Sequence, residues 1–401
     1  MKTARHTLDR RLKRNVPLIA TNEFIGSIGF FFPVTILIFE SLTGSYTLAM
    51  SVYSVMAFAT AFFEIPTGVL SDRWGRRGVL MAGSACEFLG VSCYALAFGA
   101  SHPLWMLYLG ITFYGLARSL FSGNNEAMIH ESLAALKCKH QFPKAVGRFT
   151  SMGQVGLALG GVACGLLLWA GLFYHTLILL TLIPLAFNLL VAFLTVEPPI
   201  HIIEEENTVG HMKAALKLIV KNKKLMLLTL ATGLQNGTGF SSYYFTAGFL
   251  ASVWPTWMIP LYRTGQNGIG AISFWFAGPV VRSLGAIRVL FVGSIVGNIL
   301  GLAAYATQAF FSPFLLMFTQ ISYALGTTAD RSIQQENFSD AQRATMGSLI
   351  SFSTSMVFGV SSLILGFLSD LTSPATALIG LLVFKAVSVF WIQYKLYTKH
   401  R

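Results

Sequence analysis

Long apolar runs recur along the whole chain, and they limit what it can fold into. Hydrophobic residues make up 54% of the 401 residues and charged residues only 11%, which is too apolar for a soluble domain of this size. A helix needs about 20 residues to cross the ~30 Å hydrocarbon core of a bilayer. The sequence predicts an all-α membrane protein with twelve spans, at residues 16–40, 46–70, 79–100, 104–128, 148–170, 172–196, 225–251, 261–281, 286–306, 312–337, 344–368 and 374–397.

The basic residues indicate how these spans are oriented. Nearly all of the 28 Lys and Arg residues precede the first span, follow the last or lie in alternate loops, whereas the opposite loops hold only Arg263. Because Lys and Arg accumulate on the cytoplasmic side, we expect a multi-pass protein of the inner (plasma) membrane with both termini cytoplasmic. The net charge of +12 is spread over many short loops, so no nucleic-acid partner is expected.

One connection is much longer than the others and divides the spans six and six. It contains Pro198-Pro199, an acidic run at 204–206 and a basic amphipathic stretch at 211–224, which would lie on the membrane surface or bind a partner. The predicted domains are an N-terminal six-helix bundle at 1–196, a cytoplasmic linker with an amphipathic helix at 197–224, and a C-terminal six-helix bundle at 225–401.

A polar stretch, GVLSDRWGRRGVL at 68–80, separates the second and third spans. It has two glycines, which permit a tight reversal because a residue without Cβ can take positive φ. It also has one acid and three arginines within a few residues of the bilayer edge. A connection that only joined two helices would not need these residues: Gly68, Asp72, Arg73, Gly75, Arg76 and Arg77.

This stretch resembles the signature loop between helices 2 and 3 of major facilitator superfamily (MFS) transporters. A second copy lies 210 residues further on, at 278–290, where Gly278 and Gly285 are kept and Arg282 replaces the acid. The resemblance implies the MFS fold, with twelve transmembrane helices in two pseudo-symmetric six-helix bundles. Parallel halves of this kind hold the substrate between them near the bilayer midplane.

The resemblance also implies a conformational latch on the cytoplasmic face. Asp72 would face the start of helix 11 near Ala344, where a carboxylate meets the positive end of a helix dipole. Arg76 would pair with Glu131, or with Glu126 in its place. The latch would close the cytoplasmic side and part when that side opens, and its remaining members would be Gly68, Arg73, Gly75 and Arg77.

Charged residues inside the spans are functional candidates, because a charge in the hydrocarbon region costs ~2.5–3.5 kcal/mol or more. Glu23, beside Asn22 in the first span, is the first candidate for proton coupling, since loss of hydration favours the protonated carboxyl. Asp330 is the second. Arg118 could hold a carboxylate ionised or bind an anionic substrate. Each could instead be a partnered structural group, and for Glu87 we expect that role.

Neutral polar side chains near mid-span could line a substrate cavity or pack helices. Overlapping GxxxG patterns in the span 148–170 predict close helix contact. Where the family's antiporter signature has Gly-Pro, this span has Gly160-Gly161, which counts against a drug–proton antiporter. The cavity candidates are Asn22, Arg118, Gln235, Asn236, Tyr243, Gln320 and Tyr323, and the helix-packing glycines are Gly156, Gly160, Gly161 and Gly165.

These features predict a secondary transporter that works by alternating access and exports a small amphipathic compound or drug in exchange for protons. Proton-coupled uptake of a nutrient or organic anion is the alternative, and a membrane receptor without transport is another. No HExxH, GxSxG or P-loop is present, so an enzyme is not expected. The four cysteines lack CxxC spacing and should be free thiols, without a metal or cofactor. We expect the protein to be a monomer, with its substrate, protons and the lipid bilayer as partners.

Overall fold

The computed structural model describes the backbone of residues 2–199, 223–337 and 340–398. Side chains are described in these ranges except at 2–10, 65–73, 223–225, 228, 334–337, 340–346, 348 and 393–398. Every regular element of the described backbone is a helix, which confirms the all-α prediction. The predicted amphipathic helix of the linker falls almost entirely outside these ranges.

The chain divides into two compact units that each combine two segments of sequence. The first unit comprises Met1–Pro33 and Ala59–Glu206, and the second comprises Val34–Phe58 and Asn207–Arg401. Residues 34–58 thus group with the second unit, although the repeat places them in the N-terminal bundle. The domain boundaries drawn from the sequence stay a prediction.

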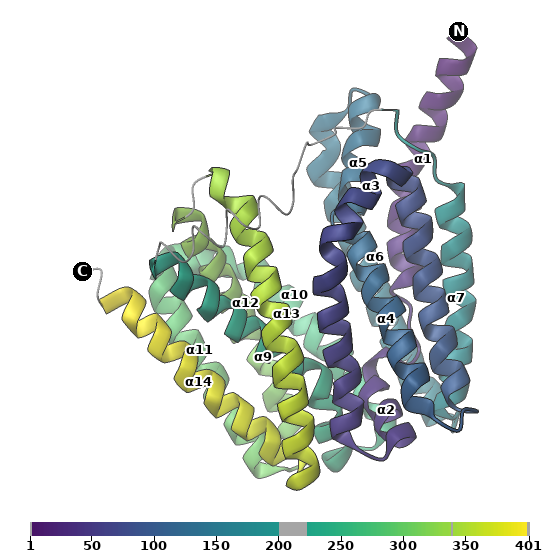
Figure 1. The fold of residues 1–401 in the computed structure, drawn as a ribbon. Helices are drawn as coiled ribbons and strands as arrows, with labels where there is room; N and C mark the ends of the chain where they lie inside the picture. Colours follow the sequence, from purple (N-terminus) through teal and green to yellow (C-terminus); the bar gives the residue numbers. More distant parts are fainter. Residues whose placement is uncertain (1, 200–222, 338–339, 399–401) are drawn as a thin grey trace. The chain divides into compact units, whose positions relative to one another are not determined.

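The first unit is built from long helices and one short one (Figure 1). They are α1 (Lys2–Gly26), the later part of α3 (Tyr46–Ala97), α4 (Pro103–Phe121), α5 (Asn124–Ala135), α6 (Phe142–Trp169) and α7 (Tyr174–Leu194), with the 3-10 turn η2 (Lys139–Gln141).

The second unit begins with the short helix α2 and the first turns of α3, and continues after the linker with six long helices. Its helices are α2 (Thr35–Thr43), α9 (Lys223–Val253), α10 (Ile259–Leu284), α11 (Ala286–Thr307), α12 (Ser312–Asn337), α13 (Asp340–Leu371) and α14 (Pro374–Thr398), with the 3-10 turn η3 (Thr256–Met258).

Eight helical segments in the described ranges are long and apolar enough to cross a membrane. Large side chains on them, such as Trp105 and Trp169, are exposed and suited to contact with lipid. Four of the twelve predicted spans, 16–40, 225–251, 261–281 and 312–337, are not among the eight. These four hold most of the polar candidates, and polar side chains lower the mean hydropathy of a helix. In the first of the four, the helix also ends at Gly26, inside the predicted span. The count of twelve stays a prediction.

The first predicted span, 16–40, is not continuous. Helix α1 ends at Gly26, an irregular segment follows, and the 3-10 turn η1 (Phe32–Val34) leads into α2. Pro33 has no N–H to donate and disfavours a helical residue before it, so one continuous α-helix through this span is disfavoured. Inside a bilayer a freed backbone group needs a partner, and the N–H of Phe30 donates to the Thr181 hydroxyl at 3.0 Å.

The stretch predicted as a loop between the second and third spans is helical up to Trp74, and only Gly75 leaves the helical conformation, at φ 76° and ψ 162°. The chain reverses direction there, as Figure 1 shows within α3. The expected role of Gly68 in this reversal was therefore wrong. The predicted span 104–128 is also divided, since α4 ends at Phe121 and Gly123 takes a φ of 71° before α5.

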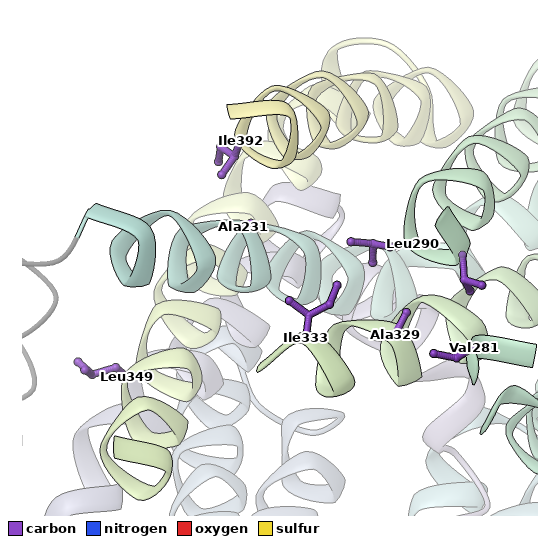
Figure 2. Packing of buried hydrophobic residues seen from close by; sticks show 8 residues of the cluster. Ala231, Val281, Leu290, Ala329, Ile333, Leu349 and Ile392 are labelled. Carbon is purple, nitrogen blue, oxygen red and sulfur yellow. The ribbon is translucent and has the colours of Figure 1, made fainter. Parts of the chain in front are cut away.

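Each unit has its own apolar core. In the second unit six helices contribute to one cluster of buried residues, which Figure 2 shows with all but Val289 labelled: Ala231, Val281, Val289, Leu290, Ala329, Ile333, Leu349 and Ile392. In the first unit the cluster is Ile19, Leu80, Met128, Ile129, Leu133, Ala145 and Ala192. The small residues let the helix backbones approach one another.

The predicted close helix contact at the GxxxG glycines is confirmed at two of them. A Cβ built on Gly156 would collide with the carbonyl of Phe24 in α1, and one built on Gly160 would lie 3.0 Å from the backbone N of Gly29. Helix α6 therefore lies directly against α1 and the break that follows it.

We expect Gly156→Ala to destabilise the protein by about 1–3 kcal/mol, because the added methyl overpacks this contact. The matched control is Gly147→Ala on the same helix, where a Cβ would meet nothing within 4 Å and alanine favours the helix. Thermal unfolding in detergent should give a lower Tm for Gly156→Ala and an unchanged or higher one for Gly147→Ala. Equal values would show that the contact is not tight.

Candidate functional site

The bend in α3 is held by a carboxylate from the end of the first unit's last helix. Glu197 follows α7, and its two oxygens accept hydrogen bonds from the backbone N–H groups of Arg76 (2.7 Å) and Arg77 (2.8 Å). These N–H groups begin the second segment of α3 and have no partner within the helix. A carboxylate is the favourable group at this positive helix end.

Gly75 is required at the bend for two separate reasons. Its positive φ lies in a region that other residues adopt only at a cost. A Cβ at this position would also lie 2.7 Å from the Glu197 carboxylate. The second copy of the motif has the same bend, since Gly285 takes φ 83° and ψ 135° between α10 and α11. This shared geometry supports the internal repeat.

The side chain of Arg76 forms the ion pair that the resemblance implied. Its Nε and Nη2 atoms each lie 3.0 Å from Oε1 of Glu131, which is only 2% exposed. Asn124 donates to the carbonyl of Arg76 at 3.1 Å. The predicted partner Glu131 is confirmed, and the substitute Glu126 is an exposed residue of the same helix.

The other residues of the predicted latch are only partly described. Arg77 donates to the carbonyl of Phe193 at 2.8 Å and lies over that ring, 5.1 Å from its centroid. The side chains of Asp72 and Arg73 lie outside the described residues, as does the expected contact of Asp72 with the start of α13. Sequence reasoning missed Glu197, although an acid directly after an apolar span was a usable signal.

A second group of polar residues lies inside the first unit, where five helices converge. Glu23 stands in the last turn of α1, directly before the break, and its electrostatic partner is Arg118 of α4. Glu87, in the later part of α3, is buried and interacts electrostatically with both. A Cβ on Gly153 of α6 would lie 2.9 Å from the Glu23 carboxylate. We call Glu23, Glu87 and Arg118 the polar cluster.

Asparagines fix this cluster in place. The buried Asn22 donates to the Ser84 hydroxyl at 3.3 Å and to the carbonyl of Asn188 at 3.2 Å. The side chain of Asn188, in turn, hydrogen-bonds Glu87. Asn22 thus joins α1 to α3 and α7 through its amide, which is a structural role beside the predicted cavity role. A structural role was expected for Glu87, because its helix is usually peripheral to the cavity in the family that the sequence resembles. Its nearness to Glu23 follows from how the helices pack, which the sequence does not show.

The candidates of the second unit are spread along two helices, α9 and α12. Asp330 of α12 is half-buried and accepts a hydrogen bond from Thr232 of α9 at 3.3 Å. Tyr243 is 41% exposed, and Tyr323 lies edge-on to Phe274. Gln235, Asn236 and Gln320 are half-buried. The structure therefore does not bring these residues into one cluster comparable to that of the first unit.

Arg263 does not lie where the charge pattern predicted. It was expected in a loop, but it lies inside α10 and is 7% exposed. Its guanidinium stacks on the Tyr243 ring, 4.1 Å from the centroid, and donates to the Tyr243 carbonyl and to Gln266. Lys385, in the middle of α14, was also missed. A single basic residue within an apolar run is a signal that could have found both.

The cysteines behave as predicted. Cys86, Cys93, Cys138 and Cys164 are free thiols. In the described part of the chain no group of three or more His, Cys, Asp or Glu residues is placed to hold a metal ion.

Comparison with known proteins supports the same class of fold. Residues 19–352 match the family model of the Major Facilitator Superfamily. YxaM of Bacillus subtilis (strain 168), described as an uncharacterized MFS-type transporter, is 23% identical over 213 residues, 51% of this chain and 50% of that protein. Tetracycline resistance protein, class C, of Escherichia coli is 30% identical over 129 residues, 32% of this chain and 29% of that protein. The chain thus spans half or less of these relatives.

Solved structures resemble this fold over nearly its whole length. The nucleoside transporter NupG has a TM-score of 0.78 at 15% identity and covers 96% of this chain and 99% of its own. A D-xylose–proton symporter has a TM-score of 0.73 at 14% identity and covers 96% of both chains. At such identities the likeness concerns the fold alone.

These findings define a multi-pass, all-helical membrane protein with polar groups inside its helical units. The chain belongs to the Major Facilitator Superfamily.

The paired bends at Gly75 and Gly285 offer a matched test of the Glu197 contact. Alanine at either position should cost about 1–3 kcal/mol through the positive φ alone. Gly75→Ala should cost about 0.5–2 kcal/mol more, the range of a lost helix cap, because the methyl displaces the Glu197 carboxylate. A Cβ at Gly285 meets nothing within 4 Å. Thermal unfolding compares the two variants, and equal losses would contradict a stabilising role of Glu197.

Proposed function

We propose that the protein is a secondary transporter that works by alternating access and exports a small amphipathic compound in exchange for protons. The observation that carries this proposal is the polar cluster of Glu23, Glu87 and Arg118 inside a helical unit. Ionisable groups at membrane depth are costly and mark substrate or proton paths.

The charge of the cluster favours exchange. With both acids ionised, one arginine balances only one of them, so a single negative charge is left in a poorly hydrated place. A proton on Glu23 or Glu87 neutralises it, and so does a cationic group of a substrate. Proton and substrate then compete for the same carboxylates, which is the condition for antiport.

Glu23 is more accessible to a substrate than Glu87. Glu23 is half-buried next to the break in α1, and Arg118 is exposed in the last turn of α4. Glu87 is buried and hydrogen-bonded to Asn188. We propose that Glu23 binds the proton and the substrate in turn. Glu87, with Asn188 as its amide partner, would keep the negative charge that balances Arg118. Asp330 is the candidate for a matching role in the second unit.

The bend at Gly75 supports the role of a latch. Arg76, Glu131 and Glu197 tie the start of one helix to α5 and to the end of α7. These contacts hold charged groups in fixed positions at the end of the α3 segment that bears Asp72 and Arg73. We propose that this group of contacts closes the cytoplasmic side of the protein in the inner membrane, and that both termini lie on the same side.

Uptake of an organic anion with protons is the second candidate, and the exposed Arg118 favours it. The net negative charge of the cluster counts against it, since an anion would enter only after protonation. The absence of a Gly-Pro pair near Gly160 counts against antiport in turn. A receptor without transport would bind the compound but would not accumulate it.

Glu23→Gln separates these roles. A thermal-shift screen of the purified protein against sugars, drugs, siderophores and amino acids first identifies a compound that binds. In proteoliposomes with a proton gradient, the variant should lose accumulation of that compound, because glutamine cannot carry a proton. Its binding of a cationic compound should weaken as well, by about tenfold (~1.4 kcal/mol) or more, because the substrate and the proton share the Glu23 carboxylate.

The matched control is Glu40→Gln in α2, an acid outside the polar cluster. It should accumulate the compound like the wild type. If Glu23→Gln also accumulates at the wild-type level, Glu23 does not couple protons to transport. If the wild type binds the compound and accumulates none, the receptor reading is favoured.

A further inference from the structure

Asp370 joins two segments of the second unit that are far apart in the sequence. It is the penultimate residue of α13, and its carboxylate reaches the start of α3. Its Oδ1 accepts from the Tyr46 N–H at 2.8 Å. Its Oδ2 accepts from the Thr47 N–H at 2.9 Å, the Thr47 hydroxyl at 2.7 Å and the Ser45 hydroxyl at 2.5 Å.

These bonds complete the cap of α3. The first N–H groups of a helix lack partners within it. Ser45 caps the third of them itself, since its hydroxyl accepts from the Leu48 N–H at 3.2 Å. The first two, of Tyr46 and Thr47, depend on Asp370. A carboxylate at a helix N-terminus forms charge-assisted bonds with the positive end of the helix dipole.

Below Asp370, the first turns of α3 lie against one face of α13. A Cβ on Gly366 would lie 2.5 Å from the Tyr46 carbonyl and 2.9 Å from Cβ of Met50. Further from Asp370 along both helices, the Ser54 hydroxyl donates to the Gly359 carbonyl at 2.7 Å. Asp370 therefore stands at the open end of a seam whose buried part is made by small residues.

The position of the seam gives it a meaning for transport. The sequence repeat assigns residues 46–58 to the first half of the chain and α13 to the second half. Helix α3 itself continues without a break from this seam to Gly75. A transporter of two halves that move against each other must separate such a seam at one stage of its cycle.

The chemistry suits a contact that is made and broken. Asp370 is exposed. When the seam separates, water can therefore replace each lost hydrogen bond, both at the carboxylate and at the freed N–H groups. In a buried ion pair, the same separation would leave each charge without a partner and would cost much more free energy. Exposed ion and hydrogen-bond contacts are worth little net energy.

We propose that Asp370 is the catch that closes the transporter at the end of the membrane where α3 begins, opposite to the Gly75 bend. This rests on the proposed alternating access and adds a positioning residue to it. Breaking the carboxylate's bonds to Ser45, Tyr46 and Thr47 frees the N-terminus of α3 and opens the seam. The role is independent of the polar cluster.

Accessibility of Met50 reports on the seam directly. Met50 is 0% exposed and lies beside Gly366. In the full-length protein without its four cysteines, Met50→Cys gives a single thiol whose labelling by a charged maleimide is followed over time. Asp370→Ala should accelerate labelling by at least about fivefold, the factor for ~1 kcal/mol of a lost cap. Asp370→Asn keeps one acceptor and should give a smaller increase.

The control is again Glu40→Gln, which removes an acid of the same unit without touching the cap and should leave labelling unchanged. Unchanged labelling in a folded Asp370→Ala variant would overturn the proposal. The measurement needs neither substrate nor a proton gradient. Failure of proton coupling would therefore leave its result intact, so the two ideas fail separately.

A cross-link tests whether the contact must break. The Ser45 and Asp370 side-chain oxygens are 2.5 Å apart, so a double variant that combines Ser45→Cys with Asp370→Cys brings two thiols close enough for a disulfide. Oxidation should abolish the transport that the reduced double variant retains for the compound found by the screen, and a reductant should restore that level. Transport by the double variant that oxidation leaves undiminished would show a permanent contact and overturn the proposal.

Discussion

The need to partner every polar group away from water governs this structure. In the hydrocarbon region an unpaired backbone N–H or charge costs several kcal/mol. The chain nevertheless breaks α1 within its first predicted span and bends α3 at Gly75. Both irregularities persist because a side chain distant in the sequence meets the freed groups, Thr181 of α7 at the break and Glu197, which follows α7, at the bend. These two departures from a straight helix thus each come with a hydrogen-bond partner.

The same constraint relates the fold to the proposed transport. The break in α1 leaves Glu23 in a terminal turn, and the glycines of α6 let that helix lie close to it. Glu87 and Arg118 reach the same region from α3 and α4. A group of charges can be kept here because amides from Asn22 and Asn188 surround it. At helix starts, carboxylates do the corresponding work, with Asp370 at the start of α3 and Glu197 at the start of its second segment, after Gly75.

Much of this was accessible from the sequence. Apolar runs of spanning length and the repeat at Gly75 and Gly285 predicted the fold. The motif at 68–80 predicted the Arg76–Glu131 pair. The break in α1 was missed because the first span was drawn from apolar length alone, and the apolar run continues through Pro33. Glu197 and Asp370 could not be assigned, because each caps a helix 120 or more residues away in sequence. Such partners follow from packing and not from local pattern.

The central claim is that protons and substrate exchange at the carboxylates of the polar cluster. The direct test is the lumenal pH of proteoliposomes that hold a pH-sensitive dye and start without a pH gradient, when a compound from the screen is added outside. Antiport predicts that the lumen becomes alkaline, since protons leave as the compound enters, and that Glu23→Gln abolishes the change. A lumen that becomes acidic, or a pH that stays constant while the compound enters, would contradict the account.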